Sequence, residues 1–545
     1  MNTCTDQRRT NQKNGTISTS STTTTSCYTK RILFPSILIQ VVKVLLLLIS
    51  GLSSKSESFT TPTTRTTNQS GHYNTVSKLS STTTSSTTIL SLKMCRPTST
   101  PSSNTASAEA AAPPPFNDRP YDLIIYGATG FTGQIACAYV KEHYPNLKVA
   151  YAGRNLSKLQ NVRSQVYGGG SSSNSTSDGK DLQLPPLIVA DAVKDPESLD
   201  ELAASTRVIA NYAGTPFIDK ALPVVEACAK HGTCYTDITG EAPFQRASYD
   251  RYNKLATETG ACIVHACGYD SVPSDLGAFI AANEMKERHG CDCTSIELVA
   301  QPGKGGVSGG TLHTGMTLMF GSKDQKADEL PGMREIKARG GNCYGLDPDG
   351  AKGGNDTVDT VMMPTYDEVA KTAVIPFVMA GANAPVVRKT NAVLNYLYGA
   401  NCSYREVQAV PNLAVGWLGM AGFGLFGALI AFPPTRWFLL NYVLPKPGEG
   451  PSKELQETGY FVSDIYAVGN SKDKPVVHAY VKSGNAGDPG YKATGRMSIE
   501  ASLCMALQRD RCALQGGVLT PASALGKTLV DRLNKTGMEL GVTAK

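Results

Sequence analysis

Three glycines spaced three apart form the part of the chain best suited to bind a ligand, in the stretch LIIYGATGFTG at 123–133. An apolar run precedes them and a helical pattern follows, as in a turn that holds a dinucleotide pyrophosphate at the start of a helix. Gly127 can turn the chain sharply, Gly130 can let phosphate oxygens approach the backbone, and Gly133 can let the helix pack closely. Because the spacing G-x-x-G-x-x-G departs from the common G-x-G-x-x-G, a tight turn without a ligand is the alternative. The predicted pyrophosphate site comprises Gly127, Thr129, Gly130, Phe131, Thr132 and Gly133.

The end of the second apolar run predicts which dinucleotide binds. An NAD-specific site usually has an Asp or Glu there, about 20 residues after the turn, to bind the ribose 2′-OH. This chain has AGRN at 152–155, with Arg154 in that place and no acid. Because arginine pairs bidentately with phosphate, we expect NADP(H) rather than NAD(H). The alternative is a surface arginine that caps a helix beginning at Leu156.

The ends of two further runs are expected to border the same cofactor. Asp191 ends the third run and is placed to reach the adenine. Asn211, Ala213 and Gly214 end the fourth run and are placed along the far side of the cofactor, since ligands of doubly wound folds bind at the carboxyl ends of the strands. Each of these four residues can equally be an ordinary turn residue at the end of a strand.

Six short apolar runs position these residues. Helical stretches such as 221–232 and 249–260 separate most of the runs, and strands that alternate with helices form a parallel sheet covered on both faces. The predicted fold is α/β: a Rossmann-type doubly wound parallel sheet over 119–285, followed by a mixed α/β second domain over 286–545 with a hydrophobic helical insertion. The predicted strands lie within 123–127, 149–154, 186–192, 207–214, 234–240 and 262–268.

Charge and cysteine spacing argue against two classes of function. The chain has 545 residues and a net charge of +6, but residues 1–117 carry eleven Lys or Arg and three acids. The other 428 residues therefore have a net charge of about −2, which gives no basis for nucleic-acid binding. The fourteen cysteines lack the paired spacing of a zinc site, Cys291 and Cys293 being the closest pair, so reduced thiols and no metal site are expected.

Seven sequence blocks follow one another in a fixed order from residue 121 to the C-terminus. They are YDLIIYGATGFTG (121–133), AGRNLSKL (152–159), YTDITGE (235–241), GYDSVPSDLGAF (268–279), SGGT (308–311), GDPGYKATGRM (487–497) and GGVLTPASALG (516–526). Together the blocks resemble the saccharopine dehydrogenase-like oxidoreductases, and within them the branch that includes the trans-acting enoyl reductases.

This resemblance implies an NAD(P)-binding domain, a mixed α/β domain and a C-terminal segment that packs back on the first domain. It also implies an oxidoreductase that reduces a double bond in a lipid-linked or polyketide-derived substrate, in lipid or glycolipid metabolism. Animal relatives are associated with lipid droplets. Two alternatives are a saccharopine-type amino-acid dehydrogenase, for which we find no matching basic cluster, and a nucleotide-binding lipid-surface protein without turnover.

A reductase also needs a proton donor and a group that polarises the acceptor. The segments after the fifth and sixth runs border the place where a nicotinamide should lie. There, Tyr269 is a candidate proton donor, and Asp270 can orient it or bond a carboxamide or sugar. Tyr491, in the motif DPGY, is a further candidate donor. The alternative for 268–279 is a turn followed by a helix that Ser274 caps.

Three other polar residues receive no catalytic role. Asp237 and Glu241, after the fifth run, are interpreted as structural residues. A second glycine-rich turn, at 303–316, enters an apolar helical pattern and is expected to bind a polar group of the substrate through its backbone N–H groups. His313 lies inside this segment and is assigned no role.

The apolar segment 413–440 begins with twenty residues, LAVGWLGMAGFGLFGALIAF, that carry no charge. A helix of that length can cross a bilayer, for which about 20 residues are needed, and its five glycines suit close helix packing. One hypothesis is a hairpin seated in a membrane or lipid-droplet surface that brings the enzyme to a lipid-like substrate. The other is a buried helix of the second domain, or one that forms a homodimer. We favour lipid contact.

Residues 1–118 are expected to be a targeting or disordered leader. Residues 32–50 are almost wholly apolar after Lys30 and Arg31, and 27 of the 50 residues from 58 to 107 are Ser or Thr. A signal-type segment before a Ser-rich, acid-poor stretch resembles the two-part leader of proteins sent to plastids. An uncleaved anchor, which would place the protein on a membrane such as the ER, is one alternative. A start at Met94, which would make the protein cytosolic, is the other.

Overall fold

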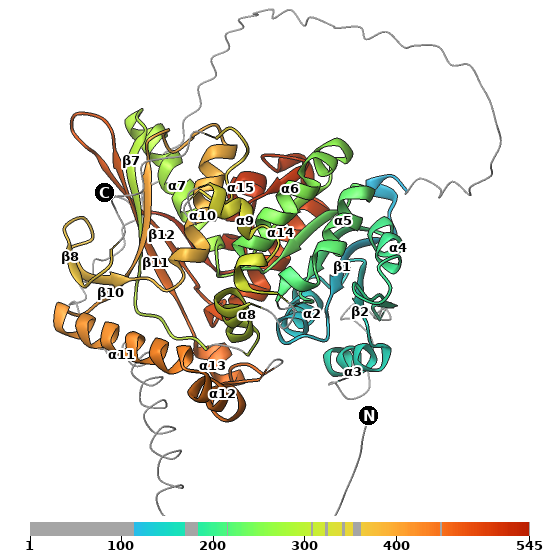
Figure 1. Ribbon diagram of the computed structural model, residues 1–545. Coiled ribbons are helices and arrows are strands. Elements are labelled where there is room, and N and C mark those ends of the chain that lie inside the picture. The colour runs from blue at the N-terminus through green and yellow to red at the C-terminus, as the bar shows by residue number, and fades with distance from the viewer. Residues whose placement is uncertain are drawn as a thin grey trace, which may run out of the picture. The chain divides into compact units, whose positions relative to one another are not determined.

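The computed structural model describes residues 114–168, 184–214, 216–306, 309–321, 325–339, 344–351, 361–446 and 449–543. All but the last five residues of the expected leader, including the apolar segment 32–50, lie outside the described residues. The described chain contains two seven-stranded sheets (Figure 1).

The first sheet is parallel throughout, in the order β13-β6-β5-β4-β1-β2-β3. Six of its strands overlap the six predicted runs, with β1 and β4 beginning one or two residues earlier, so the predicted Rossmann-type doubly wound fold is confirmed. In register, Leu123 on β1 lies beside Val149 on β2 and Val208 on β4. The strands are β1 (Tyr121–Tyr126), β2 (Val149–Gly153), β3 (Leu187–Val189), β4 (Thr206–Asn211), β5 (Cys234–Asp237), β6 (Cys262–Val264) and β13 (Gly517–Leu519).

Helices cover both faces of this sheet. Successive residues of each strand point to opposite sides, so the apolar residues of each strand are divided between two cores. Leu123 and Ile125 enter one buried core, whereas Ile124 and Tyr126 enter another. A sheet buried on both faces explains the nearly continuous apolar runs. The surrounding helices are α2 (Phe131–His143), α3 (Leu156–Tyr167), α4 (Ser198–Ala204), α5 (Leu222–His231), α6 (Ala242–Thr259), α14 (Thr494–Leu507) and α15 (Pro521–Lys535).

The C-terminal segment completes the first sheet. Strand β13 pairs in parallel with β6, with Val518 beside Ile263. Helix α14 packs against β1, β4 and β5 and against helix α2. The sequence patterns predicted six strands in this domain, and β13 adds a seventh from about 250 residues further along the chain.

The second sheet is mixed, in the order β14-β12-β11-β7-β10-β9-β8. Only β10 and β7 pair in parallel, and the other pairs are antiparallel. Its strands are β7 (Cys293–Ala300), β8 (Thr365–Asp367), β9 (Thr372–Pro376), β10 (Ser403–Val410), β11 (Val462–Gly469), β12 (Val476–Lys482) and β14 (Glu539–Val542). The predicted mixed α/β second domain is therefore confirmed. Its helices are α8 (Gly309–Phe320), α9 (Met333–Ala338), α10 (Ala380–Val393), α11 (Leu413–Ala431), α12 (Pro433–Tyr442) and α13 (Lys453–Thr458).

Helix α7 (Val272–His289) leads from the first sheet into the second and packs on β7, β11 and β12. Ser271 stands at its N-cap position. The expectation that Ser274 caps this helix is therefore wrong, because the helix begins earlier and places Ser274 in its first turn. The buried carboxylate of Asp275 accepts hydrogen bonds from the Thr390 hydroxyl and from the Ala522 N–H, at 2.5 and 2.7 Å, and so ties α7 to α10 and α15.

Among the described residues, one helix is long and apolar enough to cross a membrane. It is α11, whose most apolar window has a mean hydropathy of 1.9 and is 11% buried. Asn412 caps its first turn, with Oδ1 accepting from the Val415 N–H at 2.9 Å. Helix α12 follows directly, beginning at Pro433 (Figure 1).

Candidate active site

The turn between β1 and α2 has the geometry that its glycines predict. Gly127 has a φ of +81°, and a Cβ there would lie 2.4 Å from the backbone nitrogen of Ala213. A Cβ on Gly133 would lie 2.3 Å from the Gly127 carbonyl oxygen. Gly130 is the N-cap residue of α2 and has no side chain to satisfy the first N–H groups. Those groups are therefore available to an anion.

Three of the six predicted pyrophosphate-site residues line a cavity, and Gly127, Thr129 and Gly133 do not. Gly130, Phe131 and Thr132 face the cavity described below. The carbonyl of Thr129 accepts a hydrogen bond from the Gln134 side chain at 3.1 Å, which fixes the turn. The turn thus presents backbone, a ring and a hydroxyl group to one space.

Arg154 is exposed at the end of β2, and no described residue forms an ion pair or hydrogen bond with its guanidinium group. It does not cap α3. Asn155 does so, with Oδ1 accepting from the Lys158 N–H at 2.9 Å. The guanidinium group is therefore not committed to the described part of the fold, and its predicted contact with a ribose phosphate stays a prediction.

The side chain of Asp191 stabilises the turn after β3. Its Oδ1 accepts from the N–H groups of Val193 and Lys194, at 3.0 and 3.3 Å. These bonds, led by the one from Val193, lower the pKa of Asp191, and the charge of Arg154 adds to the effect. Asp191 is thus a turn residue close to Arg154, and its contact with an adenine stays a prediction.

The side chain of Asn211 shapes the exit from β4. Its Nδ2 donates to the Tyr235 hydroxyl at 2.9 Å, and its Oδ1 accepts from the Ala213 N–H at 2.8 Å. Gly214 then takes a φ of +99°. The amide is used within the fold, so any contact between this turn and a cofactor would come from the backbone of Ala213 and Gly214.

A cavity of about 460 Å³ lies where the pyrophosphate turn meets the loops after β5 and β6. Its other walls are helix α8, the start of α10 and the short π-helix Pro489–Ala493. From α8 and the turn before it come the glycines at 305, 306, 310 and 315, with Thr311 and Thr314. The second glycine-rich turn, expected to bind substrate, therefore borders the same space as the first.

Asp270 lines this cavity, and its carboxyl group has no hydrogen-bonding partner among the described residues, although its backbone carbonyl accepts from the Ser271 hydroxyl at 2.5 Å. Burial raises the pKa of Asp270 to about 6. Its Oδ2 lies 3.1 Å from the position that a Cβ on Gly240 would occupy, so a larger residue there would displace the carboxylate. An unpaired, half-buried carboxyl group beside an open cavity is suited to exchange a proton with a ligand.

Tyr269 and Tyr491 also line the cavity. The Tyr269 ring packs edge-on against Phe461 at 4.8 Å, and burial raises the pKa of its hydroxyl above the usual value. The Tyr491 ring packs edge-on against Phe131 at 5.1 Å, and its hydroxyl lies 3.5 Å from the Thr311 hydroxyl. All three candidate catalytic residues thus reach one cavity, although their roles stay predictions.

Glu241 is a cavity residue that the sequence analysis interpreted as structural. Its carboxylate accepts from the N–H groups of Phe217 and Ile218, at 2.9 and 2.8 Å, and from the Thr314 hydroxyl at 3.3 Å. It therefore links the loop after β4 to helix α8. Burial raises the pKa of Glu241 to about 7. Its position four residues after Asp237, the last residue of β5, was the signal available in the sequence.

Asp237 is structural, as interpreted. It accepts from the N–H groups of Thr239 and Ala266, at 3.1 and 3.0 Å, and pairs with the buried imidazole of His265 at 2.7 Å. These bonds join the loops after β5 and β6, which carry Glu241 and Asp270. Among the described residues, no group of three or more His, Cys, Asp or Glu is arranged to hold a metal ion.

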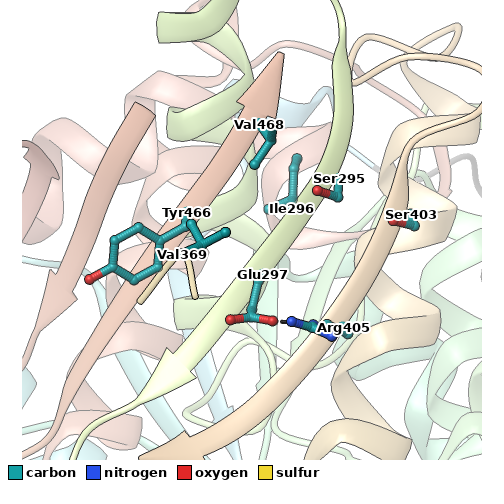
Figure 2. A pocket seen from close by; sticks show the side chains of 8 residues that line it. All are labelled: Ser295, Ile296, Glu297, Val369, Ser403, Arg405, Tyr466 and Val468. Atoms are coloured by element: carbon teal, nitrogen blue, oxygen red, sulfur yellow. Dashed lines mark hydrogen bonds and ion pairs between the residues drawn. The ribbon is translucent and has the colours of Figure 1, made fainter. Parts of the chain in front are cut away.

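A second, smaller pocket of about 140 Å³ lies on the second sheet, between β7, β10 and β11 (Figure 2). Its charged groups neutralise one another, because Arg405 pairs with Glu297 and also with Asp367, the latter at 2.6 Å. No residue of the pyrophosphate turn reaches it. The larger cavity is therefore the candidate active site.

The parallel sheet, the glycine turn at its carboxyl edge and the adjoining cavity define the class of doubly wound α/β proteins that bind nucleotides. No protein-family model matches the chain. Trans-acting enoyl reductases of Mycobacterium tuberculosis strain H37Rv and Mycobacterium leprae are 33% and 31% identical to it, over 78% of this chain and 98% of theirs. A second M. tuberculosis protein, for which that name is provisional, is 35% identical with the same coverage.

The chain belongs to the trans-acting enoyl reductase family and is an oxidoreductase. Among solved structures, the apo saccharopine dehydrogenase (L-Glu forming) of Saccharomyces cerevisiae aligns with 77% of this chain and 99% of its own. The TM-score of that alignment is 0.45 and the sequence identity is 11%.

Proposed function

We propose that this oxidoreductase uses NADP(H) to reduce a carbon–carbon double bond in a lipid-like substrate. The observation that carries the proposal is the single cavity that joins the pyrophosphate turn to Asp270 and to helix α8. A nicotinamide that follows the carboxyl edge of the sheet from this turn would enter that cavity. The names of the curated relatives support the reaction type.

NADP(H) is preferred because of the end of β2. Arg154 stands there without a partner among the described residues, and no acid is present to bind a ribose 2′-OH. A ribose phosphate would supply the bidentate partner that a free guanidinium group lacks. The backbone N–H groups of Phe131 and Thr132, in the first turn of α2 beside the cavity, would hold the pyrophosphate.

A bound nicotinamide would supply a hydride to one carbon of the double bond. The other carbon would need a proton, and Asp270 is placed to give it, since its carboxyl group lines the cavity and has a pKa raised to about 6. The Asp270 carboxylate left by this transfer would regain its proton from water. Glu241 holds the loop after β4 against α8 and is a positioning residue.

The lining favours this substrate class over an amino acid. The described residues that line the cavity include three carboxyl side chains and no Lys, Arg or His. A saccharopine-type amino-acid dehydrogenase would need cations to bind the carboxylates of its substrate. The third hypothesis, a nucleotide-binding protein without turnover, gives no reason for an unpaired, half-buried carboxyl group at Asp270, whose partial removal from water costs free energy.

The cofactor is tested by titrating the purified protein with NADPH and NADH. We expect NADPH to bind more tightly, and Arg154→Ala to weaken NADPH binding roughly tenfold to hundredfold while leaving NADH binding unchanged, because charge-assisted hydrogen bonds are lost. Lys254→Ala removes a cation whose side chain is 90% exposed on α6 and is the matched control. Equal affinity of the wild type for both dinucleotides would refute the choice of NADP(H).

The reaction is tested with NADPH and a water-soluble trans-2-enoyl thioester. Asp270→Asn should lower kcat by about 10²- to 10⁴-fold without changing the affinity for NADPH. Because a donor must be protonated and the pKa of Asp270 is raised to about 6, wild-type kcat/KM should fall as the pH rises through about 6. A wild-type rate that is flat across this range, or full activity of Asp270→Asn, would contradict the role of Asp270.

A further inference from the structure

Helix α11 exposes an apolar face. Its only buried residues are Gly416 and Ile430. Trp417 and Leu418 are 54% and 62% exposed. Surface helices of globular proteins normally place polar residues on the outer side, but this side consists of Leu413, Ala414, Trp417, Leu418, Ala421, Gly424, Leu425, Gly427, Ala428 and Ala431.

Both ends of α11 are attached to the folded body. Near its start, a Cβ on Gly416 would lie 3.0 Å from Ile375 on β9 and from Pro364. Near its end, Ile430 packs with Leu439 of α12 and with helix α8 in a small apolar cluster. The helix has nineteen residues and so spans about 28 Å along the surface of the protein. With both ends held, α11 lies beside the body, as Figure 1 shows, and only its outer side is free for a partner.

The charges around this hairpin match a phospholipid surface. Between Glu406 and Glu449 the chain carries two cations, Arg436 and Lys446, and no acid. Arg436 lies over the Phe320 ring at 4.1 Å, and Lys446 is exposed. Cations beside an apolar face would meet lipid phosphates.

The aromatic residues point to the same partner. Both tryptophans of the chain lie on the hairpin, where Trp417 and Trp437 are 54% and 60% exposed. Phe432 and Tyr442 are 59% and 65% exposed beside them. Trp and Tyr are favoured at the boundary between lipid and water, since one end of each ring is apolar and the other is polar.

Helix α8 connects this surface to the cavity. Gly310, Thr311 and Thr314 face the cavity. Leu312 and Met316 pack in the apolar cluster with α11 and α12. At the end of α8, Met319 and Phe320 are 69% and 44% exposed. One helix thus has an active-site side, a hairpin side and an exposed apolar end.

We infer that the α11–α12 hairpin lies flat in the surface of a phospholipid layer, and that the substrate passes from this layer along α8 into the cavity. The docking of the hairpin is inferred from the exposed apolar face of α11, whereas the passage of substrate along α8 rests on the proposed function. The attached ends of α11 distinguish this arrangement from a helix that crosses the bilayer. The substrate would then be a lipid whose double bond lies within reach of the headgroup region.

The docking is tested by flotation of the full chain with phosphatidylcholine vesicles, without cofactor or substrate. We expect the wild type to float with the vesicles and the double variant Trp417→Glu/Leu418→Glu to bind roughly a hundredfold more weakly, since two large side chains no longer enter the lipid. Leu507→Glu changes a leucine that is 45% exposed at the end of α14 and should bind as the wild type does. Circular dichroism of each variant checks the fold.

Several outcomes would overturn the docking. They are a wild type that stays in the soluble fraction, equal binding of the double variant, or a dimer that the double variant dissociates while vesicles bind neither protein. The flat orientation is tested with Trp417→Phe and Trp437→Phe, which leave one tryptophan each. Quenchers attached near the lipid headgroup should quench both fluorophores more than quenchers at the chain end, and the reverse order would refute a flat hairpin.

The passage along α8 is tested by turnover of a long-chain enoyl lipid embedded in the vesicles. Its turnover should fall in proportion to vesicle binding in the Trp417→Glu/Leu418→Glu variant, and undiminished turnover would refute the passage. Because vesicle binding is measured without substrate, its failure is distinguishable from failure of the proposed reaction. The latter would appear as no turnover of the soluble thioester by the wild type.

Discussion

Helices α14 and α11 reverse the usual relation between polarity and burial. Helix α14 contains an arginine, a glutamate and two serines, yet thirteen of its residues are buried. Helix α11 contains no charged residue, yet only two of its nineteen residues are buried. Burial therefore follows the place of a helix in the fold, since α14 lies between the first sheet and α15, whereas α11 lies at an edge of the second domain (Figure 1). An apolar helix left on the outside needs a different partner, and a polar helix taken inside needs partners for each of its polar groups.

Most polar side chains of α14 have such partners, although the buried Nε of Arg496 has none among the described residues. Glu500 is fully buried and accepts from the hydroxyls of Tyr139 and Tyr144, at 2.7 and 2.6 Å, and from Arg532 at 2.7 Å. The Ser502 hydroxyl bonds that of Thr236 on β5 at 2.7 Å. The polar residues thus join α14 to the sheet, to α2 and to α15.

The largest effect should come from removing the centre of this network. Glu500→Ala removes the acceptor of Arg532 Nε and of two tyrosine hydroxyls and leaves the charge of Arg532 uncompensated, which should lower the free energy of unfolding by about 3–5 kcal/mol. Denaturant unfolding followed by circular dichroism measures the change. A loss below about 1 kcal/mol, the size of a surface ion pair, would show that α14 does not depend on its polar contacts.

A matched pair of leucines compares the two helices directly. Leu503 on α14 is fully buried, whereas Leu418 on α11 is 62% exposed. Leu503→Ala should cost about 2–5 kcal/mol through lost burial and a cavity. Leu418→Ala should stay within about 0.5 kcal/mol in aqueous buffer. Equal losses in the same denaturant titration would mean that α11 is buried in solution, for example by a second copy of the chain.

Binding of lipid to the exposed side of α11 should raise the free energy of unfolding of the protein. Phosphatidylcholine vesicles bind the folded hairpin, so at a hundred times the dissociation constant they should raise the free energy of unfolding by about 2.7 kcal/mol. The Trp417→Glu/Leu418→Glu variant should show no such increase, whereas Leu507→Glu should. Thermal unfolding with and without vesicles measures the change, and an equal increase in all three proteins would point to a general effect of the vesicles.

The smallest effect concerns the glycines of α11. A Cβ on Gly424 or Gly427 would meet nothing within 4 Å, so the fold in solution does not need glycine at either position. Each change to alanine should stabilise the helix by about 0.5–1 kcal/mol. Gly416→Ala, whose Cβ would lie 3.0 Å from Ile375 and Pro364, is the contrasting variant and should gain less or lose stability. A loss at Gly424 would indicate a close neighbour on the outer side.

The sequence predicted the first sheet well because its strands are buried on both faces and so appear as apolar runs. It did not predict β13, whose three residues begin with Gly517, follow Gly516 and are too few to form a recognisable run. The start of α7 was placed too late, because Ser274 has the chemistry of a cap and Ser271 occupies the position. Local patterns identify a helix, but they do not show which of two nearby serines lies at its N-cap.

The candidate site was predictable where backbone geometry sets the residue type. Gly127 and Gly133 are required by contacts of 2.4 and 2.3 Å that a Cβ would make, and such constraints leave a spacing in the sequence. The sequence did not predict that Glu241 lines the cavity and holds its walls together, because this role depends on the loop after β4 and on Thr314, 73 residues away. For Asn211 and Asp191 the sequence left a turn role open as the alternative, and both side chains accept hydrogen bonds from neighbouring N–H groups.

Strand β13 and helix α14 determine how late in synthesis the first sheet can be completed. Strand β13 and helix α14 come from residues after 493, yet they complete a sheet whose first strand begins at Tyr121. During synthesis one face of β1, β4 and β5 stays uncovered until nearly the whole chain has left the ribosome. A nascent chain that stops before Thr494 cannot close this face, so a C-terminal truncation or fusion is in effect a perturbation of the nucleotide-binding domain.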